Sequence, residues 1–258
     1  MKALFIGDIV GKIGRKTIAK IVPEIVKKEK IDLVIANCEN IAHGKGITEA
    51  TIKEALDSQI DILTSGNHIW AKKDYELVLS KYPVLRPANF PTKLGEGVKL
   101  IEVGTKKVLV INLLGRVFMK ESLDDPFKKF DEILEEYKGK FDLAIVDFHS
   151  EASSEARAFG LYVDGKVSAV FGTHRHIMTA DAQILGQGTF YITDLGMVGA
   201  TPSVLGIDKD EVIKSYLTGM PFKHEIPEDG KAEFNALIID FSKDPYKFKQ
   251  IREIISID

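Results

Sequence analysis

Five apolar runs in this chain end in residue types that bind metal ions. Asp8 follows the run Leu4–Gly7, Glu39 and Asn40 follow Leu33–Asn37, Asn67 and His68 follow Ile60–Thr64, His149 follows Leu143–Val146, and His174 and His176 follow Val167–Phe171. Carboxylate and amide oxygens suit hard cations, and imidazole nitrogens suit Zn, Mn and Fe. The chain therefore offers ligands for metal-dependent chemistry, provided that the five runs end at a common place in the fold.

Each candidate ligand also has an ordinary structural explanation. Asp8 is also a typical turn cap, Asn67 fits a left-handed polar turn, and His149 taken alone is typical of a partly buried histidine. The pair His174 and His176 is the strongest local signal, although two surface histidines remain the alternative. A single ion with open positions needs fewer ligands than the candidates provide. The set instead suits two ions about 3.5–4 Å apart that share a carboxylate. The seven candidate metal ligands are Asp8, Glu39, Asn40, Asn67, His149, His174 and His176.

The elements between these runs predict how the ligands are brought together. The first half alternates apolar runs with helical patterns, such as the face of Ile18, Ile21, Val22 and Ile25, where Pro23 predicts a kink or a restart. This order favours parallel strands joined by right-handed crossovers. Because ligands bind beyond the carboxyl ends of such strands, we expect the candidate residues to share one crevice.

The second half predicts antiparallel additions to this arrangement. Val98–Val103 and Lys107–Leu113 form a hairpin pattern, and Ala232–Ser242 with Phe248–Ile257 form a closing antiparallel pair. Asp124 is predicted to start a helix that carries Pro126, and Asp208 to cap another, with Glu211 three residues on. The fold class expected is α/β, with two packed mixed β-sheets flanked by helices. No linker or repeat is evident, so residues 1–258 are expected to form a single domain.

The composition of the 258 residues limits the class of partner. A net charge of −3 without long runs of like charge does not indicate an extended surface for nucleic acid. The single cysteine, Cys38, allows no intramolecular disulfide, and no apolar stretch approaches the length of a membrane span or a signal peptide. A cytoplasmic protein with a small-molecule substrate and no membrane partner is expected.

Other catalytic motifs do not fit the sequence. Gly7, Gly11 and Gly14 match neither the spacing of a nucleotide P-loop nor that of a dinucleotide fingerprint, and no Gly-x-Ser-x-Gly elbow of a serine hydrolase occurs. An amidohydrolase barrel also uses a His-x-His pair, but after its first strand, and this chain is short for eight βα units.

The order of the motifs resembles that of the calcineurin-like metallophosphoesterases. In that family an Asp is followed by a second acid, Gly-Asn-His, a lone His and Gly-x-His-x-His. Two positions depart from the usual pattern, because Val10 stands where a histidine is expected and Glu39 replaces the usual bridging Asp. In these two departures the chain resembles the YmdB-like phosphodiesterases. The strings that carry this resemblance are Gly7-Asp8-Ile9-Val10-Gly11, Asn37-Cys38-Glu39-Asn40, Thr64-Ser65-Gly66-Asn67-His68, Asp147-Phe148-His149 and Gly172-Thr173-His174.

The resemblance implies a four-layer αββα sandwich and a dinuclear phosphodiesterase. It implies that Glu39 bridges two ions, with Asp8, Asn40 and His176 at the first and Asn67, His149 and His174 at the second. His68 would be the general acid for the leaving group, and a hydroxide bridging the ions would attack phosphorus. The implied metals are Fe or Mn, with Zn or Mg as alternatives, and the implied substrates are 2′,3′- and also 3′,5′-cyclic nucleotides.

Two alternatives stay open at this point. A general phosphomonoesterase of the same fold would use the same ligands. A non-catalytic, metal-bearing regulatory protein would not need His68 beside Asn67. A homo-oligomer is the expected assembly.

Overall fold

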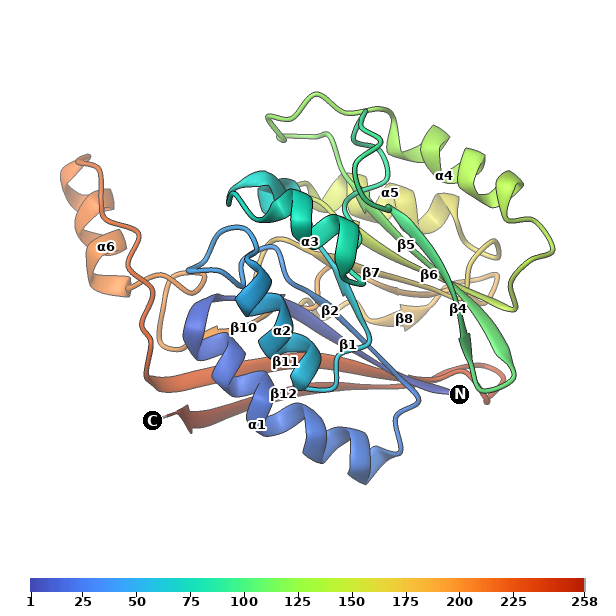
Figure 1. The fold of residues 1–258 in the computed structure, drawn as a ribbon, viewed down its shortest axis with the longest axis horizontal. Coiled ribbons are helices and arrows are strands. Elements are labelled where there is room, and N and C mark those ends of the chain that lie inside the picture. Colours follow the sequence, from blue (N-terminus) through green and yellow to red (C-terminus); the bar gives the residue numbers. More distant parts are fainter. Residues whose placement is uncertain (258) are drawn as a thin grey trace.

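The computed structural model describes residues 1–257, which form two six-stranded sheets packed face to face (Figure 1). The first sheet has the order β12 (Lys247–Ile257), β11 (Gly230–Asp240), β10 (Met197–Ala200), β1 (Lys2–Ile9), β2 (Leu33–Asn37) and β3 (Ile62–Thr64). The second has the order β4 (Val98–Val103), β5 (Lys106–Leu114), β6 (Leu143–His149), β7 (Ala169–Thr173), β9 (Phe190–Ile192) and β8 (Gln183–Ile184). Both sheets are mixed, as the sequence predicts.

The strands that carry the candidate ligands run parallel to their neighbours. In the first sheet β1 pairs in parallel with β2 and β10, and β2 pairs in parallel with β3. In the second sheet β5, β6, β7 and β9 are all parallel. The antiparallel partners are β11 and β12 in the first sheet, and β4 and β8 in the second. Each sheet therefore presents several strand ends on one edge.

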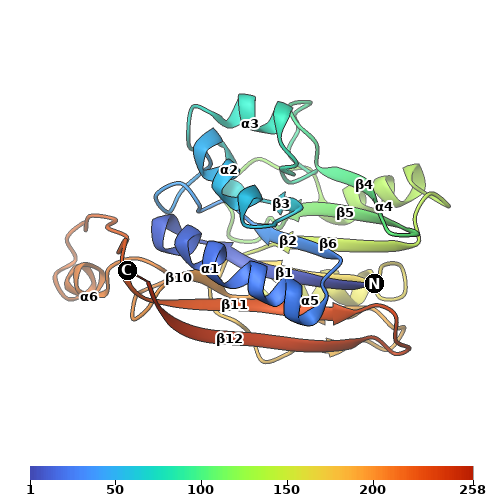
Figure 2. The ribbon, with the colours of Figure 1, turned by 60° about the horizontal axis from the view of Figure 1, so that its bottom comes forward.

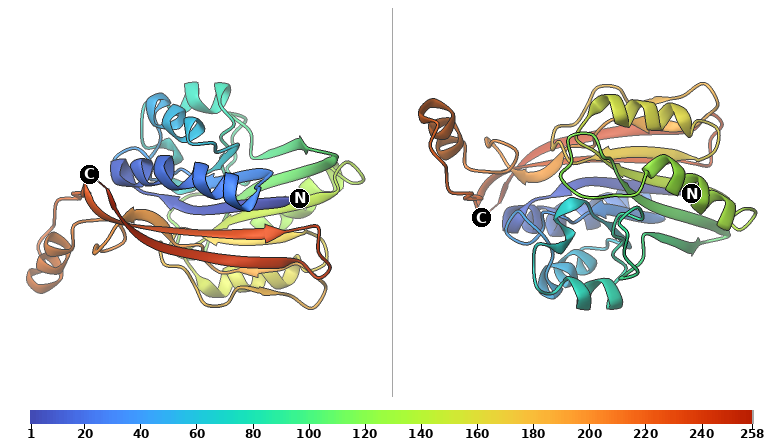
Figure 3. Two further views of the ribbon diagram at one scale, coloured as in Figure 1. Left: turned by 90° about the horizontal axis from the view of Figure 1, so that it is seen from below. Right: turned by 90° about the horizontal axis from the view of Figure 1, so that it is seen from above.

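Helices cover the outer faces of both sheets. The helices within residues 1–257 are α1 (Gly11–Glu29), α2 (Glu49–Asp57), α3 (Tyr75–Lys81), α4 (Pro126–Glu136), α5 (Ser153–Tyr162) and α6 (Lys209–Thr218), with a short 3-10 helix at Asn67–Trp70, and of these α6 stands apart from the sheets (Figure 1). Figure 2 shows α1 and α2 over the first sheet, and both views in Figure 3 place α4 and α5 beyond the second. No helix within residues 1–257 is long and apolar enough to cross a membrane.

The alternation of side chains along β1 explains the four layers. Ala3 and Phe5 face the second sheet and join an apolar core with residues such as Ile145 and Phe171. Leu4 and Ile6 point the other way and pack with the apolar faces of α1 and α2. Because successive side chains of a strand point to opposite faces, a strand that is apolar at every position is buried on both sides. This arrangement confirms the predicted αββα sandwich.

The ends of the helices show which local sequence signals determine them and which expectations were wrong. Thr48 caps α2 in a reciprocal capping box with Thr51, and Asp208 caps α6 by accepting from the N–H groups of Asp210 and Glu211. The predicted start of α4 was one residue early, because Asp125 and not Asp124 accepts from the N–H of Phe127. α1 continues through Pro23 without the restart that the proline suggested, since its buried face continues from Ile13 to Ile25.

One helix stands apart from the layers. In Figure 1, α6 projects from the body of the protein, and the side chains of Ile213, Tyr216 and Leu217 are exposed. The segment that carries it is joined at its base by a hydrogen bond of 2.8 Å from the N–H of Asp208 to the carbonyl of Glu225.

β10 was not foreseen from the sequence, because its run of Met197–Ala200 is too short to show a period.

Candidate metal centre

The seven predicted ligands come from both sheets and converge at one edge of the sandwich. Asp8 lies near the end of β1, Glu39 and Asn40 follow β2, and Asn67 follows β3. From the second sheet, His149 ends β6, and His174 and His176 follow β7. Asp8, Glu39 and His149 are almost completely buried. The strand ends of two sheets thus place acids and amides opposite imidazoles.

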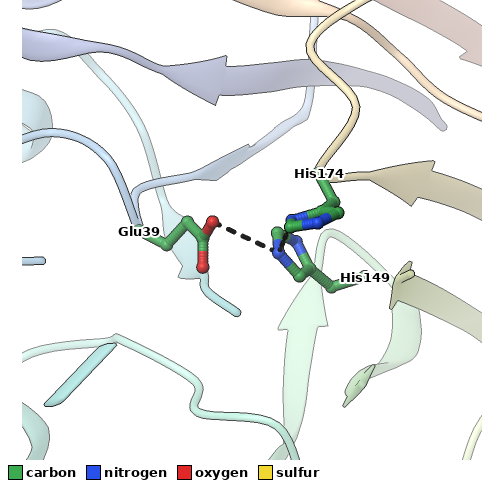
Figure 4. A group of neighbouring side chains, drawn as sticks. All are labelled: Glu39, His149 and His174. Carbon is green, nitrogen blue, oxygen red and sulfur yellow. Dashed lines mark hydrogen bonds and ion pairs between the residues drawn. The ribbon is translucent and has the colours of Figure 1, made fainter. Parts of the chain in front are cut away.

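Glu39 and two imidazoles form the tightest group at this edge. Glu39 Oε1 lies 3.2 Å from His149 Nε2, and that nitrogen lies 3.0 Å from His174 Nδ1. One ligand atom from each of the three residues lies within 4.8 Å of the others, and Figure 4 shows the three side chains pointing toward one another. A carboxylate and two imidazole nitrogens at this spacing are suited to hold a divalent cation.

A second group surrounds Asn40. Its Nδ2 lies 2.9 Å from His176 Nε2, and its Oδ1 lies 3.1 Å from His68 Nδ1. His176 Nε2 is in turn 3.9 Å from Asp8 Oδ1. Asn40 Nδ2 also donates to Glu39 Oε1 at 3.3 Å. Glu39 therefore lies between the two groups.

Two of the predicted ligands have a buried side-chain oxygen without a hydrogen-bond partner within residues 1–257. The two oxygens are Asp8 Oδ1 and Asn67 Oδ1. A buried polar atom without a partner is costly, and most such atoms in folded proteins are satisfied. A cation would satisfy both oxygens, so the residues present fit a bound metal.

Outer partners orient the imidazoles. His149 Nδ1 donates to Thr173 Oγ1 at 2.8 Å, and that hydroxyl donates to Asp147 Oδ1 at 2.7 Å, which leaves His149 Nε2 toward Glu39. His176 Nδ1 lies 3.0 Å from the carbonyl of Leu205, and His174 Nε2 lies 2.8 Å from Glu151 Oε2. Such contacts fix the ring and the tautomer of a metal-binding histidine.

Asp147 also connects the two sheets beneath the site. Its Oδ2 accepts from Asn37 Nδ2 at 3.1 Å and from Thr64 Oγ1 at 2.5 Å, and both of these residues belong to the first sheet. Sequence reasoning missed Asp147, Thr173 and Asn37. For Asn37 and Asp147 the available signal was their spacing, because a residue two positions before Glu39 or His149 lies on the same face of the chain.

The charges of the site reflect burial and mutual attraction. Burial raises the pKa of Asp8. Burial also acts to raise the pKa of Glu39, but His149 outweighs it and holds that pKa well below its usual range. For His149 burial acts against protonation, yet Glu39 and then Asp8 raise its pKa to about 9. Burial and the neighbouring His149 lower the pKa of His174 to about 3, which leaves a neutral imidazole. Glu39 and His174 are therefore in the forms that bind metal, whereas Asp8 and His149 would lose a proton when a cation binds.

Backbone geometry at the site leaves little room for change. A Cβ atom on Gly66 would lie 2.3 Å from both Glu39 Oε2 and His149 Nε2. His174 and His176 have φ values of 106° and 63°, which are uncommon for residues with a side chain. Strained residues persist only where the surroundings enforce them, and they gather at functional sites.

The side chain of Arg175 is held by groups of the protein itself. Its guanidinium lies 3.3 Å from the buried Asp194 and donates to the carbonyls of Thr193 and Glu151. Burial raises the pKa of Asp194 to about 7, and the N–H groups of Arg175 and Gly196 oppose that rise. Arg116 pairs with Asp125 at 2.8 Å. Lys45, in contrast, lines the space beside the candidate metal centre.

Two hollows adjoin the cluster on either side of His68. The larger, of about 650 Å³, is lined by Asn67, His68, Trp70, Phe118, Lys120 and Glu151 among others. The smaller, of about 350 Å³, has a more apolar wall that includes Val10, Leu205, Ile207 and Ile226. Both reach His174, so a molecule in either hollow would contact the candidate metal centre.

The arrangement of the two sheets is shared with a solved Staphylococcus aureus structure whose description reads "Putative 5′-Nucleotidase". That structure matches 99% of this chain and 54% of its own with a TM-score of 0.59, at 14% identity, which shows the fold alone. The chain belongs to the YmdB-like family, whose model, described as YmdB-like protein, matches residues 4–254.

Relatives that cover the whole chain bear this out. A Bacillus subtilis protein named 2′,3′-cyclic-nucleotide 2′-phosphodiesterase is 42% identical over all of this chain and 98% of its own length. A solved Mycoplasma pneumoniae structure, described as a novel phosphatase, is 34% identical, with a TM-score of 0.93, over all of this chain and 94% of that one. A Thermus thermophilus structure, described as a hypothetical protein, is 37% identical with a TM-score of 0.91 over the full length of both chains.

Proposed function

We propose that this protein is a metal-dependent phosphoric ester hydrolase that cleaves cyclic nucleotides, 2′,3′-cyclic monophosphates first and 3′,5′-cyclic monophosphates second. The observation that carries the proposal is the pair of partnerless buried oxygens, on Asp8 and Asn67, beside the Glu39 and His149 pair. The activity named for the Bacillus subtilis relative supports the choice of substrate. The whole chain would act as one catalytic domain.

Two divalent ions, Fe or Mn, are proposed to be shared by this set of ligands. Asp8, Asn40 and His176 would hold the first, Asn67, His149 and His174 would hold the second, and Glu39 would serve both. The position of Glu39 between the two groups supports this division, since its Oε1 lies within 3.3 Å of both His149 and Asn40. When bound, such ions supply an acidic water and offset the charge of phosphoryl oxygens.

His68 is proposed to act on the leaving group. Its Nδ1 faces Asn40 Oδ1, an amide oxygen that only accepts, so Nδ1 carries a proton and Nε2 stays available to the substrate. The ring lines both hollows and its side chain is 29% exposed, unlike the fully buried His149. To act as the general acid, His68 would have to be the imidazolium, which would keep its Nδ1 proton on Asn40 and give its Nε2 proton to the leaving alkoxide oxygen. In this role His68 does not belong to the ligand set.

A substrate panel tests the function. Metal-loaded protein is mixed with 2′,3′-cyclic AMP, 3′,5′-cyclic AMP and an aryl phosphomonoester, with the chelated protein as control. We expect metal-dependent opening of the cyclic diesters. Turnover of the monoester alone would instead identify a phosphomonoesterase, and inactivity of the fully loaded protein on all three would favour the regulatory alternative.

A further inference from the structure

Phe118 adopts an unfavourable backbone conformation and gains no burial from it. It has a φ of 65°, and its side chain is 83% exposed. It is the third residue of a turn closed by a hydrogen bond of 3.2 Å from the N–H of Met119 to the carbonyl of Arg116. Glycine is the usual residue in such a position, because a bulky side chain at positive φ is strained. Folding therefore does not account for a phenylalanine here.

The turn is held rigidly against the candidate metal centre. The N–H of Gly115 donates to the carbonyl of His149 at 2.9 Å. The N–H groups of Arg116 and Val117 donate to the carboxylate of Glu155 at 2.9 and 3.0 Å. These contacts thus fix the turn that carries Phe118 relative to the end of β6, where His149 lies, before any ligand binds.

The ring lies in the wall of the larger hollow, which also contains Asn67, His68 and His174. Within residues 1–257 it pairs with no other aromatic ring, whereas the neighbouring Trp70 is held edge-on by Tyr75 and Phe90. An exposed aromatic face at the mouth of a charged hollow is suited to stack on a flat, apolar group of a bound molecule.

We propose that Phe118 is the platform on which the nucleobase of the substrate stacks while its phosphate lies at the metal centre. This inference rests on the proposed function for the identity of the substrate. Every base offers an aromatic face, so stacking gives affinity with little choice among bases. The protein should therefore accept purine and pyrimidine cyclic nucleotides alike. Glu155 is a positioning residue, because it fixes the turn and does not touch the base.

The test measures how much a base adds to affinity. Metal-loaded protein is titrated calorimetrically with AMP and with ribose 5-phosphate, which lacks the base. We expect AMP to bind more tightly, and Phe118→Ala to reduce the ratio of the two affinities by about 5- to 150-fold. Phe118→Trp should keep the ratio. Glu155→Gln should reduce it in part, since one anchor of the turn is weakened. Tyr216→Ala on α6 is the matched control, because Tyr216 is also 83% exposed and lies outside both hollows.

Three binding results would overturn the proposal. They are equal binding of AMP and ribose 5-phosphate by the unmodified protein, an unchanged ratio in Phe118→Ala, and a loss of the ratio in Ile207→Ala alone, which would place the base in the smaller hollow. A loss of thermal stability in Phe118→Ala would also overturn it, because the ring would then serve the fold. Since binding is measured apart from turnover, AMP recognition through Phe118 without diester cleavage would refute the proposed function and leave this inference standing.

Discussion

The two sheets contribute different chemistry to the same edge. The first sheet supplies the oxygen half of the site, which consists of Asp8, Glu39, Asn40 and Asn67, and the second supplies the imidazole half, which consists of His149, His174 and His176. Each imidazole has an outer partner, on Thr173, Glu151 or Leu205. In the oxygen half, Asp8 Oδ1 and Asn67 Oδ1 have none within residues 1–257.

This difference indicates a division of work between the sheets. The imidazole half is oriented by the protein itself, so its nitrogens are directed before any ion arrives. In the oxygen half, burial of Asp8 Oδ1 and Asn67 Oδ1 without partners costs free energy, and a bound cation would remove that cost. Glu39 and Asn40 join the two halves, because Glu39 contacts His149 of the second sheet at 3.2 Å and Asn40 contacts His176 at 2.9 Å.

Removing Glu39 should break both halves and give the largest effect. Glu39→Ala is expected to lose both ions and, with them, the hydrolytic activity, because the remaining oxygens and nitrogens no longer share a ligand. Metal analysis after gel filtration measures this, with Glu136→Ala, at the exposed end of α4, as control. Retention of both ions by Glu39→Ala would contradict the bridging role.

Replacing His68 should separate catalysis from metal binding. His68 follows β3 on the oxygen side, and it is not assigned as a ligand. His68→Ala should lower the rate by about 10²–10⁴-fold while the protein keeps its metal, because only the general acid is removed. Parallel measurement of kcat and bound metal checks this. A joint fall of both would make His68 a ligand or a structural residue.

Filling the space between the halves should disturb both at once. In Gly66→Ala the new methyl group would meet Glu39 Oε2 and His149 Nε2 at 2.3 Å. We expect a loss of about 1–3 kcal/mol in the free energy of unfolding, typical of overpacking, together with weaker metal binding. Denaturant titration measures the first quantity. Gly186→Ala is the control, since its Cβ would meet nothing closer than 3.9 Å, and equal behaviour of the two variants would count against a crowded centre.

Loosening one imidazole should give the smallest effect. Thr173→Val removes the hydroxyl that accepts from His149 Nδ1 and leaves the ligands in place. Metal affinity should fall by about 10- to 100-fold, as for other outer partners of metal ligands. Competition with a chelator of known affinity measures the change, with Thr218→Val on α6 as control. An unchanged affinity would show that packing alone holds the ring.

The sequence predicted those features that depend on strand order. Parallel runs ending in ligand types, at Asp8, Glu39 and His149, were enough to expect one crevice, because strand ends must share an edge. The hairpin of β4 and β5 and the closing pair of β11 and β12 are confirmed for the same reason, since their alternation and turns are local signals.

Features that depend on the contacts of individual side chains were not predictable. Asp147 resembles any polar residue near a strand end until Asn37 and Thr64 of the other sheet are seen to donate to it. Asp125 displaced Asp124 as the cap of α4 because the choice depends on which carboxylate reaches the N–H of Phe127, a difference that neighbouring aspartates do not reveal.

The position of β1 within its sheet determines when this enzyme becomes complete during synthesis. β1 is made before β10 and β11, yet it pairs with both of them as well as with β2, and the N–H of Asp8 donates to the carbonyl of Gly196. A ribosome that has released only the first half of the chain therefore carries a strand with one flank open to stray pairing. Folding must wait for residues up to Asp240, and a nascent chain shorter than that has no finished cradle for a cation.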